Sequence, residues 1–214
     1  MKMYDFHIHS IFSDGELIPA EIGQRYSKFG YREIAITDHA DNSNLKFILS
    51  NTVDALGELS KESGISVIPG IELTHIPPLM LDGLVKKARK LGARIIIVHG
   101  ETLAEPVQKG TNFKAVNNPD VDILAHPGLI TPLEAKLAAK NGIFLELSSR
   151  FGHSLANGHV AKVSLKAGAS LILNSDAHAP EDILTKKEKV AIARGAGLSK
   201  ENSRMVVSVK PFPV

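Results

Sequence analysis

The 214-residue chain has no cysteine, few aromatic residues, a small net charge and no long hydrophobic run. Without cysteine it can form neither disulfides nor thiolate metal sites, so any metal ion must be held by nitrogen and oxygen ligands. Aromatic residues make up only 5% of the chain, which leaves few platforms for stacking the bases of single strands. The formal charge of +2 argues against a strongly nucleic-acid-binding surface, though not against a local basic pocket.

The absence of long apolar stretches bears on location. The strongest apolar run, Ile95 to Val98, is far too short to cross a bilayer, and no signal peptide fits the N-terminus because an apolar segment is missing there. We therefore expect a cytoplasmic protein with no membrane partner. The length and the 43% hydrophobic content suit a single domain, residues 1–214, with a full core.

What the chain does have is a regular alternation of short apolar runs and longer amphipathic stretches. Strands are predicted at residues 4–9, 33–37, 66–72, 94–99, 122–125, 143–147 and 170–174. Helices are predicted at residues 19–29, 45–63, 79–91, 132–141, 158–167 and 180–194. Glycines follow five of these helices in C-cap positions: Gly30, Gly64, Gly92, Gly142 and Gly168. Residues 101–119 look like an irregular loop with room for a short helix, and residues 206–209 could form an edge strand or a contact.

Residues of metal-ligating type recur near the ends of the predicted strands. They are His9, His39, Glu72, His99, His126 and Asp176. The steps between them are 30, 33, 27, 27 and 50 residues, and a βα unit takes roughly 30 residues. The longest step needs one further strand with no acid or histidine at its tip, and residues 143–147 fit. The pattern predicts an α/β fold with a TIM-barrel-like seven-stranded barrel and its site at the C-terminal ends of the strands. An open doubly wound sheet is the alternative, but it would spread the ligands too widely.

Two pairs of residues with i, i+2 spacing bracket the set. His7 and His9 should project to one face of their strand while Phe6 and Ile8 face the helices, and Asp176 and His178 repeat the spacing. Asp14, in a Ser-Asp-Gly turn, could be a simple turn residue or a further ligand from the first loop. The predicted metal ligands are thus His7, His9, Asp14, His39, Glu72, His99, His126, Asp176 and His178. Nine ligands are too many for one ion, so two or three ions are implied, and the lack of sulfur favours Zn, Mn or Fe.

Five of the histidines also have an ordinary structural interpretation. His39 could neighbour a helix cap, His99 could be a hydrogen-bonded core residue, and His126 could be an exposed turn residue. For His75 we expect an exposed loop, and for His159 a surface or core position on a helix.

Two residues after the sixth predicted strand could bind substrate. Arg150 and His153 follow residues 143–147 and so lie on the same rim. An arginine at the mouth of a metal site is well shaped for bidentate binding of phosphate. The structural alternative for Arg150 is a solvated surface position.

At these residues the chain resembles the PHP (polymerase and histidinol phosphatase) family. The matching pieces are His7-Ile8-His9 with Ser13-Asp14-Gly15, Thr37-Asp38-His39, Gly70-Ile71-Glu72, His99, His126-Pro127 and Asn174-Ser175-Asp176-Ala177-His178. The resemblance implies a distorted (β/α)7 barrel, a trinuclear metal centre and phosphoesterase activity. It assigns His7, His9, Glu72 and Asp176 to one ion, Glu72, His99 and His126 to a second, and Asp14, His39 and His178 to a third.

The function expected from this resemblance is hydrolysis of a small phosphorylated metabolite by metal-activated hydroxide, as in histidinol phosphatase. The catalytic set would be His7, His9, Glu72, His99, His126, Asp176 and Arg150, with Arg150 and His153 contacting substrate. The alternatives are a nuclease-type phosphodiesterase or DNA-processing module, and a catalytically silent metal-binding module. Composition makes nucleic acid the less favoured partner, and the oligomeric state is left open.

Overall fold

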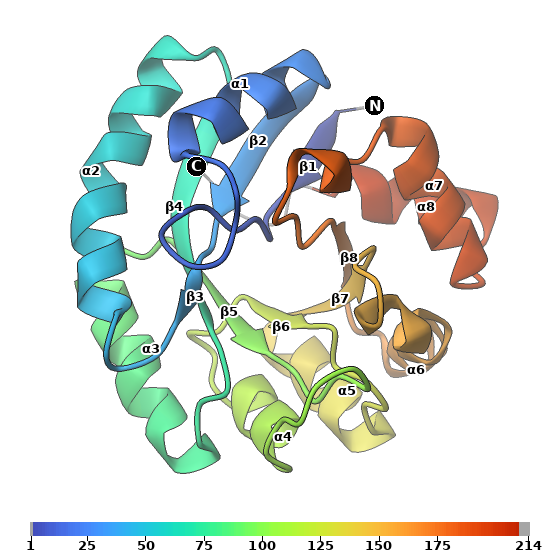
Figure 1. Cartoon of the computed structure of the whole chain (residues 1–214). Helices are drawn as coiled ribbons and strands as arrows, with labels where there is room; N and C mark the ends of the chain where they lie inside the picture. Colours follow the sequence, from blue (N-terminus) through green and yellow to red (C-terminus); the bar gives the residue numbers. More distant parts are fainter. Residues whose placement is uncertain (1, 210–214) are drawn as a thin grey trace.

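The strands form a nearly closed parallel barrel in the computed structural model, which describes residues 2–209 (Figure 1). Along the main path the order is β1-β2-β4-β5-β6-β7-β8, and every pairing is parallel. The strands are β1 (Met3–Asp5), β2 (Tyr31–Ile36), β4 (Ser66–Leu73), β5 (Ile95–His99), β6 (Ile123–Ala125), β7 (Phe144–Ser148) and β8 (Leu171–Asn174), with a short β3 (His39–Ala40) beside β4. The predicted distorted (β/α)7 barrel is confirmed, and β3 is an addition that the sequence pattern did not indicate.

Helices surround this ring of strands (Figure 1). They are α1 (Pro19–Lys28), α2 (Leu45–Glu62), α3 (Leu81–Lys90), α4 (Thr111–Val116), α5 (Pro132–Asn141), α6 (Asn157–Ala167), α7 (Lys186–Gly195) and α8 (Lys200–Ser208). The five predicted C-cap glycines, Gly30, Gly64, Gly92, Gly142 and Gly168, all have positive φ. At Gly142 and Gly168 the backbone takes the left-handed conformation that ends α5 and α6 and turns the chain into the next strand.

Two predicted segments differ from the structure near the C-terminus. Residues 180–194 form a short 3-10 turn and then α7 rather than one helix, because a capping box at Thr185 starts a new helix. Residues 206–208 lie in α8 rather than in an edge strand. There Val206 and Val207 are buried on the inner face of the helix.

The seam between β1 and β8 is closed partly by side chains. The Phe6 N–H donates to Asn174 Oδ1 at 3.0 Å, and the Ser175 N–H donates to Asp5 Oδ1 at 3.1 Å. Beyond the ends of these strands, the His9 N–H donates to the Ala177 carbonyl at 2.9 Å, where Ile8 and Ala177 form an isolated parallel bridge. Side-chain amide and carboxylate groups thus replace part of the backbone hydrogen bonding that β1 and β8 do not form with each other. They bring His7 and His9 beside Asp176 and His178.

The barrel interior is apolar below the site. One buried cluster contains Phe6, Ala35, Ile68 and Ile97 together with other strand residues, whereas Ile8 belongs to a cluster with side chains of α1. The expectation that both Phe6 and Ile8 face the helices is therefore wrong for Phe6. Regular strand structure ends at Asp5, so strict alternation does not continue through residues 6–9. No helix within residues 2–209 is long and apolar enough to span a membrane.

Candidate metal centre

All nine predicted ligands gather at the C-terminal ends of the strands. His7 and His9 follow β1, His39 begins β3, Glu72 lies near the end of β4, His99 ends β5, His126 follows β6, Asp176 and His178 follow β8, and Asp14 reaches in from the loop before α1. Parallel strands place their carboxyl ends on one rim, so residues up to 171 positions apart meet there.

A first group lies deepest in the rim. Ligand atoms of His7, His9 and Asp176 all lie within 4.8 Å of one another. The Asp176 Oδ1 atom is 3.6 Å from His7 Nε2 and 3.2 Å from His9 Nε2. The Glu72 Oε2 atom is 3.3 Å from His7 Nε2 and 3.6 Å from His9 Nε2. These four residues are the set that the resemblance assigns to one ion, and each is at most 2% exposed.

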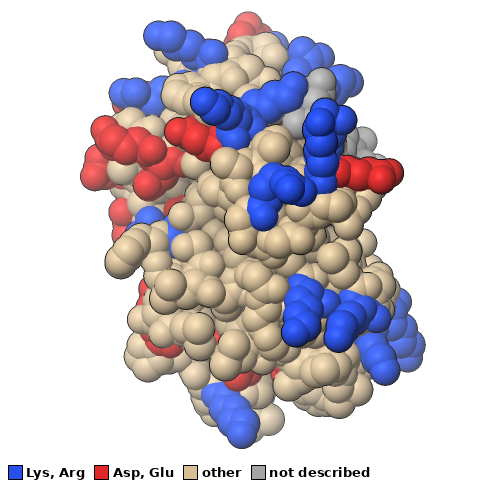
Figure 2. Space-filling model, turned by 90° about the vertical axis from the view of Figure 1, so that its right-hand side faces the viewer, with Lys and Arg blue, Asp and Glu red and all other residues tan. Residues whose placement is uncertain are grey.

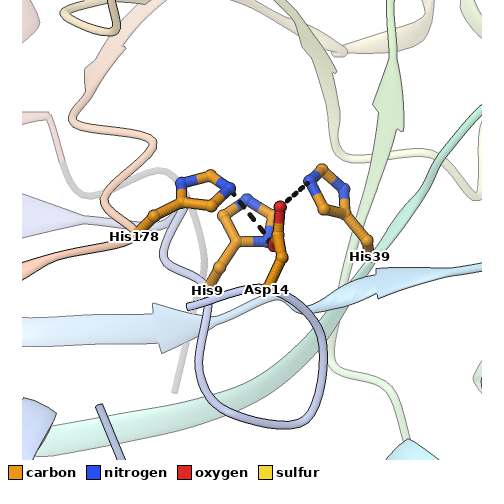
Figure 3. A group of neighbouring side chains, drawn as sticks. All are labelled: His9, Asp14, His39 and His178. Atoms are coloured by element: carbon orange, nitrogen blue, oxygen red, sulfur yellow. Dashed lines mark ion pairs between the residues drawn. The ribbon is translucent and has the colours of Figure 1, made fainter. Parts of the chain in front are cut away.

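A second group, drawn in Figure 3, is more exposed than the first. It joins Asp14, His39 and His178, and the structure adds His9, whose ring lies 4.1 Å from each of the other two histidine rings. The Asp14 carboxylate is 3.3 Å from His178 Nε2 and 3.7 Å from His39 Nε2. His9 therefore lies between the first and second groups. Its Nε2 atom is near the Asp176 carboxylate of the first group, and its Nδ1 atom is near the Asp14 carboxylate of the second.

A third group is formed by histidines alone. Ring nitrogens of His99, His126 and His153 lie within 4.8 Å of one another, and all three side chains are buried. Glu72, which the resemblance assigns to the ion at His99 and His126, has its Oε1 atom 3.6 Å from His126 Nε2. His153, predicted to contact substrate, is thus placed among the metal-type residues.

The donor atoms of the deepest group fit divalent ions. His7 Nε2 and both ring nitrogens of His9 are inaccessible to solvent and have no hydrogen-bond partner among the described residues. Burying unpaired polar atoms beside carboxylates costs several kcal/mol in total, a cost that ligation by cations removes. The buried clusters are consistent with several metal ions, held entirely by nitrogen and oxygen.

Burial and nearby charges shift the pKa values of neighbouring groups in different directions. Burial raises the pKa of Asp176 to about 6, although the nearby His7 and His126 pull it down. Burial disfavours the charged form of His7, but Glu146, Asp176 and Glu72 together raise its pKa well above the ordinary value. Burial, with His39 and His7 close by, lowers the pKa of His9 well below its ordinary value. Such divergent pKa shifts within one cluster of residues are typical of functional sites.

Backbone strain occurs at the same place. His126 has a φ of 26° and Asp176 a φ of 57°, in the left-handed region that non-glycine residues rarely adopt. Such conformations persist where the surroundings over-determine them, and they concentrate at functional sites. Here they turn two side chains into the rim directly after β6 and β8.

Comparison with known proteins identifies the family. The PHP domain family model matches residues 5–109. Ribonuclease P protein component 3 of Methanosarcina barkeri is 31% identical over 98% of this chain and 87% of its own length. The chain belongs to the PHP domain family. Membership implies metal-dependent phosphoesterase chemistry, in agreement with the clusters above.

Other relatives of this PHP domain differ in description. An uncharacterized protein of Methanocaldococcus jannaschii is 49% identical over 92% of this chain and 90% of its own length. A protein described as a probable phosphatase, from a Thermoanaerobacter species, is 27% identical over 92% of this chain and 87% of its own length. Among solved structures, a two-domain Bacteroides vulgatus protein with a PHP-like metal-dependent phosphoesterase superposes with a TM-score of 0.54 at 19% identity. The superposition covers 96% of this chain and 61% of that one, a likeness that shows the fold.

Sequence reasoning missed one buried carboxylate in this PHP domain. The strand at residues 143–147 was predicted to supply no acid or histidine at its tip, but Glu146 on β7 is fully buried and points into the rim. Its Oε1 atom accepts from His7 Nδ1 and from Asn174 Nδ2, both at 2.8 Å, and its Oε2 atom accepts from the His126 N–H at 3.1 Å. A carboxylate inside an otherwise apolar strand was the available signal, since such a group is costly to bury without partners.

Both carboxylate oxygens of Glu146 are engaged by protein donors, so its role toward a metal ion would be to position His7. Because Nδ1 of His7 is engaged by Glu146, Nε2 is the ring nitrogen that faces Glu72 and Asp176, and such carboxylate–histidine pairs set both tautomer and orientation of metal ligands.

We expect Glu146→Gln to weaken metal affinity and activity by about 10- to 100-fold. All three partners of Glu146 are donors, so an amide NH2 group would face a donor whichever way it turns. Metal affinity measured by competition with a chelator checks this, with Glu58→Gln at an exposed position of α2 as the control. Unchanged affinity in a folded Glu146→Gln protein would contradict the role.

Proposed function

We propose that this PHP domain hydrolyses phosphate monoesters of small metabolites, with histidinol phosphate and related compounds as the first substrates to test. The observation that carries the proposal is the position of Arg150 beside the buried clusters. Its Nη1 atom lies 3.5 Å from the Asp176 carbonyl and 4.0 Å from the Asp182 carboxylate, and about a third of its side chain is exposed. The relative described as a probable phosphatase supports the same chemistry.

The residues divide the task between them. Zn, Mn or Fe ions bound at the clusters would neutralise phosphate oxygens and lower the pKa of water. His7, His9, Glu72 and Asp176 would hold the deepest ion, and Asp14, His39 and His178 the outermost. Arg150, with five N–H donors and only long contacts to its neighbours, would grip the non-bridging oxygens of the phosphate. Its guanidinium thereby orients the ester at the mouth of the site.

Arg150→Ala is expected to lower kcat/KM for phosphate monoesters by about 10- to 100-fold, mainly through KM, because a hydrogen bond to a charged group contributes about 1.5–3 kcal/mol. Arg150→Lys should recover only part of this loss, since a lysine cannot bind in a bidentate manner. Steady-state kinetics on p-nitrophenyl phosphate measure the effect, with Arg204→Ala on α8 as the control. An unchanged KM in Arg150→Ala would remove Arg150 from the phosphate site.

The proposed function is tested by a substrate panel with the protein loaded with Mn, Zn or Fe in turn. We expect hydrolysis of p-nitrophenyl phosphate and of at least one metabolite monoester such as histidinol phosphate, abolished by a chelator and restored by added metal. Full activity after exhaustive chelation would refute the metal dependence. Cleavage of oligonucleotides without turnover of any monoester would refute the substrate class.

A second candidate function is processing of nucleic acid. It is favoured by the relatives described as ribonuclease P protein component 3. It is also favoured by cations on the face formed by α7 and α8, where Lys186, Lys187, Lys200 and Arg204 line one shallow hollow. Figure 2 shows Lys and Arg side chains gathered on this side of the molecule. Salt-dependent binding of RNA, lost when these four residues are replaced by Ala, would support this candidate.

A further inference from the structure

The loop between β5 and α4 brings a further carboxylate, Glu105, to the group formed by His99, His126 and His153. Glu105 Oε2 lies 3.2 Å from His99 Nε2, and Glu105 Oε1 lies 3.6 Å from His153 Nε2. Glu105 is not among the nine residues that the family pattern marks. Its side chain is 41% exposed, whereas the two histidines that it meets are buried.

His153 is aimed into the same space by this loop. Its Nδ1 atom is 2.7 Å from Thr102 Oγ1, and its ring stacks on that of His126 with centroids 4.0 Å apart. When the Nδ1–H group of His153 donates a hydrogen bond to the Thr102 hydroxyl, the Nε2 lone pair is left facing Glu105. One loop therefore both orients His153 and supplies the carboxylate.

The loop itself is anchored on two sides. Glu101 Oε1 accepts hydrogen bonds from the N–H groups of Gly110 and Asn112, at 2.9 and 3.0 Å. These bonds hold the two ends of the loop together. A Cβ atom on Gly152 would lie only 2.9 Å from Ala104 Cβ, so the loop packs closely against the residue before His153. The position of Glu105 follows from these contacts.

Two further observations point to a ligand at this place. His99 and His126 are 2% and 3% exposed, and Nδ1 of each has no hydrogen-bond partner among the residues that the structure describes. His75, predicted as an exposed loop residue, is indeed 46% exposed, yet its Nε2 atom lies 3.2 Å from Glu105 Oε2 and its ring stacks on His99. It does so with a strained φ of 52°.

We propose that His153 and Glu105 bind a divalent ion together with His99 and His126. The donor set that they complete has three imidazoles and one loop carboxylate, a combination that suits zinc. His75 lies beside the same Glu105 oxygen as His99 and helps to hold the carboxylate in place. The proposal deepens the proposed function and rests on it for the use of the ion, but the residues can be tested by metal binding alone.

The test titrates the full-length metal-free protein with Zn²⁺ and, separately, with Co²⁺, whose visible absorption reports the number and type of its ligands. We expect His153→Gln and Glu105→Gln each to weaken one binding step by at least about tenfold and to change the Co²⁺ spectrum of that step. His159→Gln on α6 and Glu58→Gln on α2 are the matched controls and should bind like the unmodified protein. If His153→Gln does not fold, Glu105→Gln, in a half-exposed side chain, still decides the question.

The outcomes separate this proposal from the proposed function. Unchanged Zn²⁺ affinity and Co²⁺ spectra in both variants overturn the ligand role of His153 and Glu105, even if the protein hydrolyses monoesters. Weakened binding in both variants upholds it, even if no phosphate ester in the panel is hydrolysed.

Discussion

Replacing Glu72 by Gln is expected to lower phosphoesterase activity by at least about 100-fold and to reduce the metal content of the purified protein. The Glu72 carboxylate lies where the groups meet, with Oε2 2.6 Å from His39 Nδ1 and 3.3 Å from His7 Nε2, and Oε1 3.6 Å from His126 Nε2. Burial alone would raise its pKa, but His7 and His39 hold the pKa well below its usual range, so it remains ionised. A neutral amide of the same shape removes the charge that cations at this junction require.

The experiment compares activity, metal content and folding in one series. Glu72→Gln is set against Glu58→Gln, an exposed carboxylate on α2, with each protein purified in the same metal-supplemented buffer. Metal content by mass spectrometry should fall with activity, while circular dichroism should show retained secondary structure. A Glu72→Gln protein with full metal content and full activity would remove Glu72 from the centre.

Replacing Lys189 by Met is expected to destabilise the protein by about 3–5 kcal/mol. Lys189 on α7 is fully buried, donates to the Tyr4 carbonyl, and lies 3.8 Å from the Asp5 carboxylate under the barrel seam. Burial raises the pKa of Asp5 and lowers that of Lys189, and each partially offsets the effect on the other. Removing the cation leaves Asp5 as a buried carboxylate whose remaining partners are mainly backbone N–H groups.

Urea unfolding measures the loss in Lys189→Met against Lys187→Met, which removes an exposed cation from the same helix. The double variant Lys189→Met with Asp5→Asn should lose less stability than the sum of the two single variants, because it leaves no unpaired charge. Equal unfolding midpoints for Lys189→Met and Lys187→Met would show that the buried pair does not hold the seam.

Much of the fold could be predicted because its signals are local and repeated. Apolar runs bounded by residues such as Gly142 and Gly168 mark where each helix stops and each strand begins, and the structure has the seven strands that this rhythm indicates. The prediction from this pattern was wrong where the local backbone geometry is irregular. The chain leaves strand structure at Asp5, so Phe6 enters the barrel interior, and a capping box at Thr185 divides a predicted helix.

A site residue could be predicted where it is the one polar residue at the end of an otherwise apolar strand, as Glu72 and His99 are. Glu146 lies in a similar apolar run, but its role depends on hydrogen-bond donors from His7, His126 and Asn174. No spacing in the sequence reveals these contacts. Glu105 lies in an irregular loop among other polar residues, where a carboxylate is ordinary. Its position over His99 and His153 follows only from how that loop packs.

The amino-acid sequence by itself determined the strand and helix order, the nitrogen and oxygen character of the metal-type residues, and their place at the strand ends, since each follows from short-range patterns. Only the tertiary structure decided how those residues divide into groups and that His9 stands between two of them. It also decided that Glu146 and Glu105 contact the ligand histidines and that Lys189 pairs with Asp5 under the seam. These depend on closure of the barrel, which brings residues 5–9 against residues 174–178, and contacts across so long a separation are set by packing and not by local sequence.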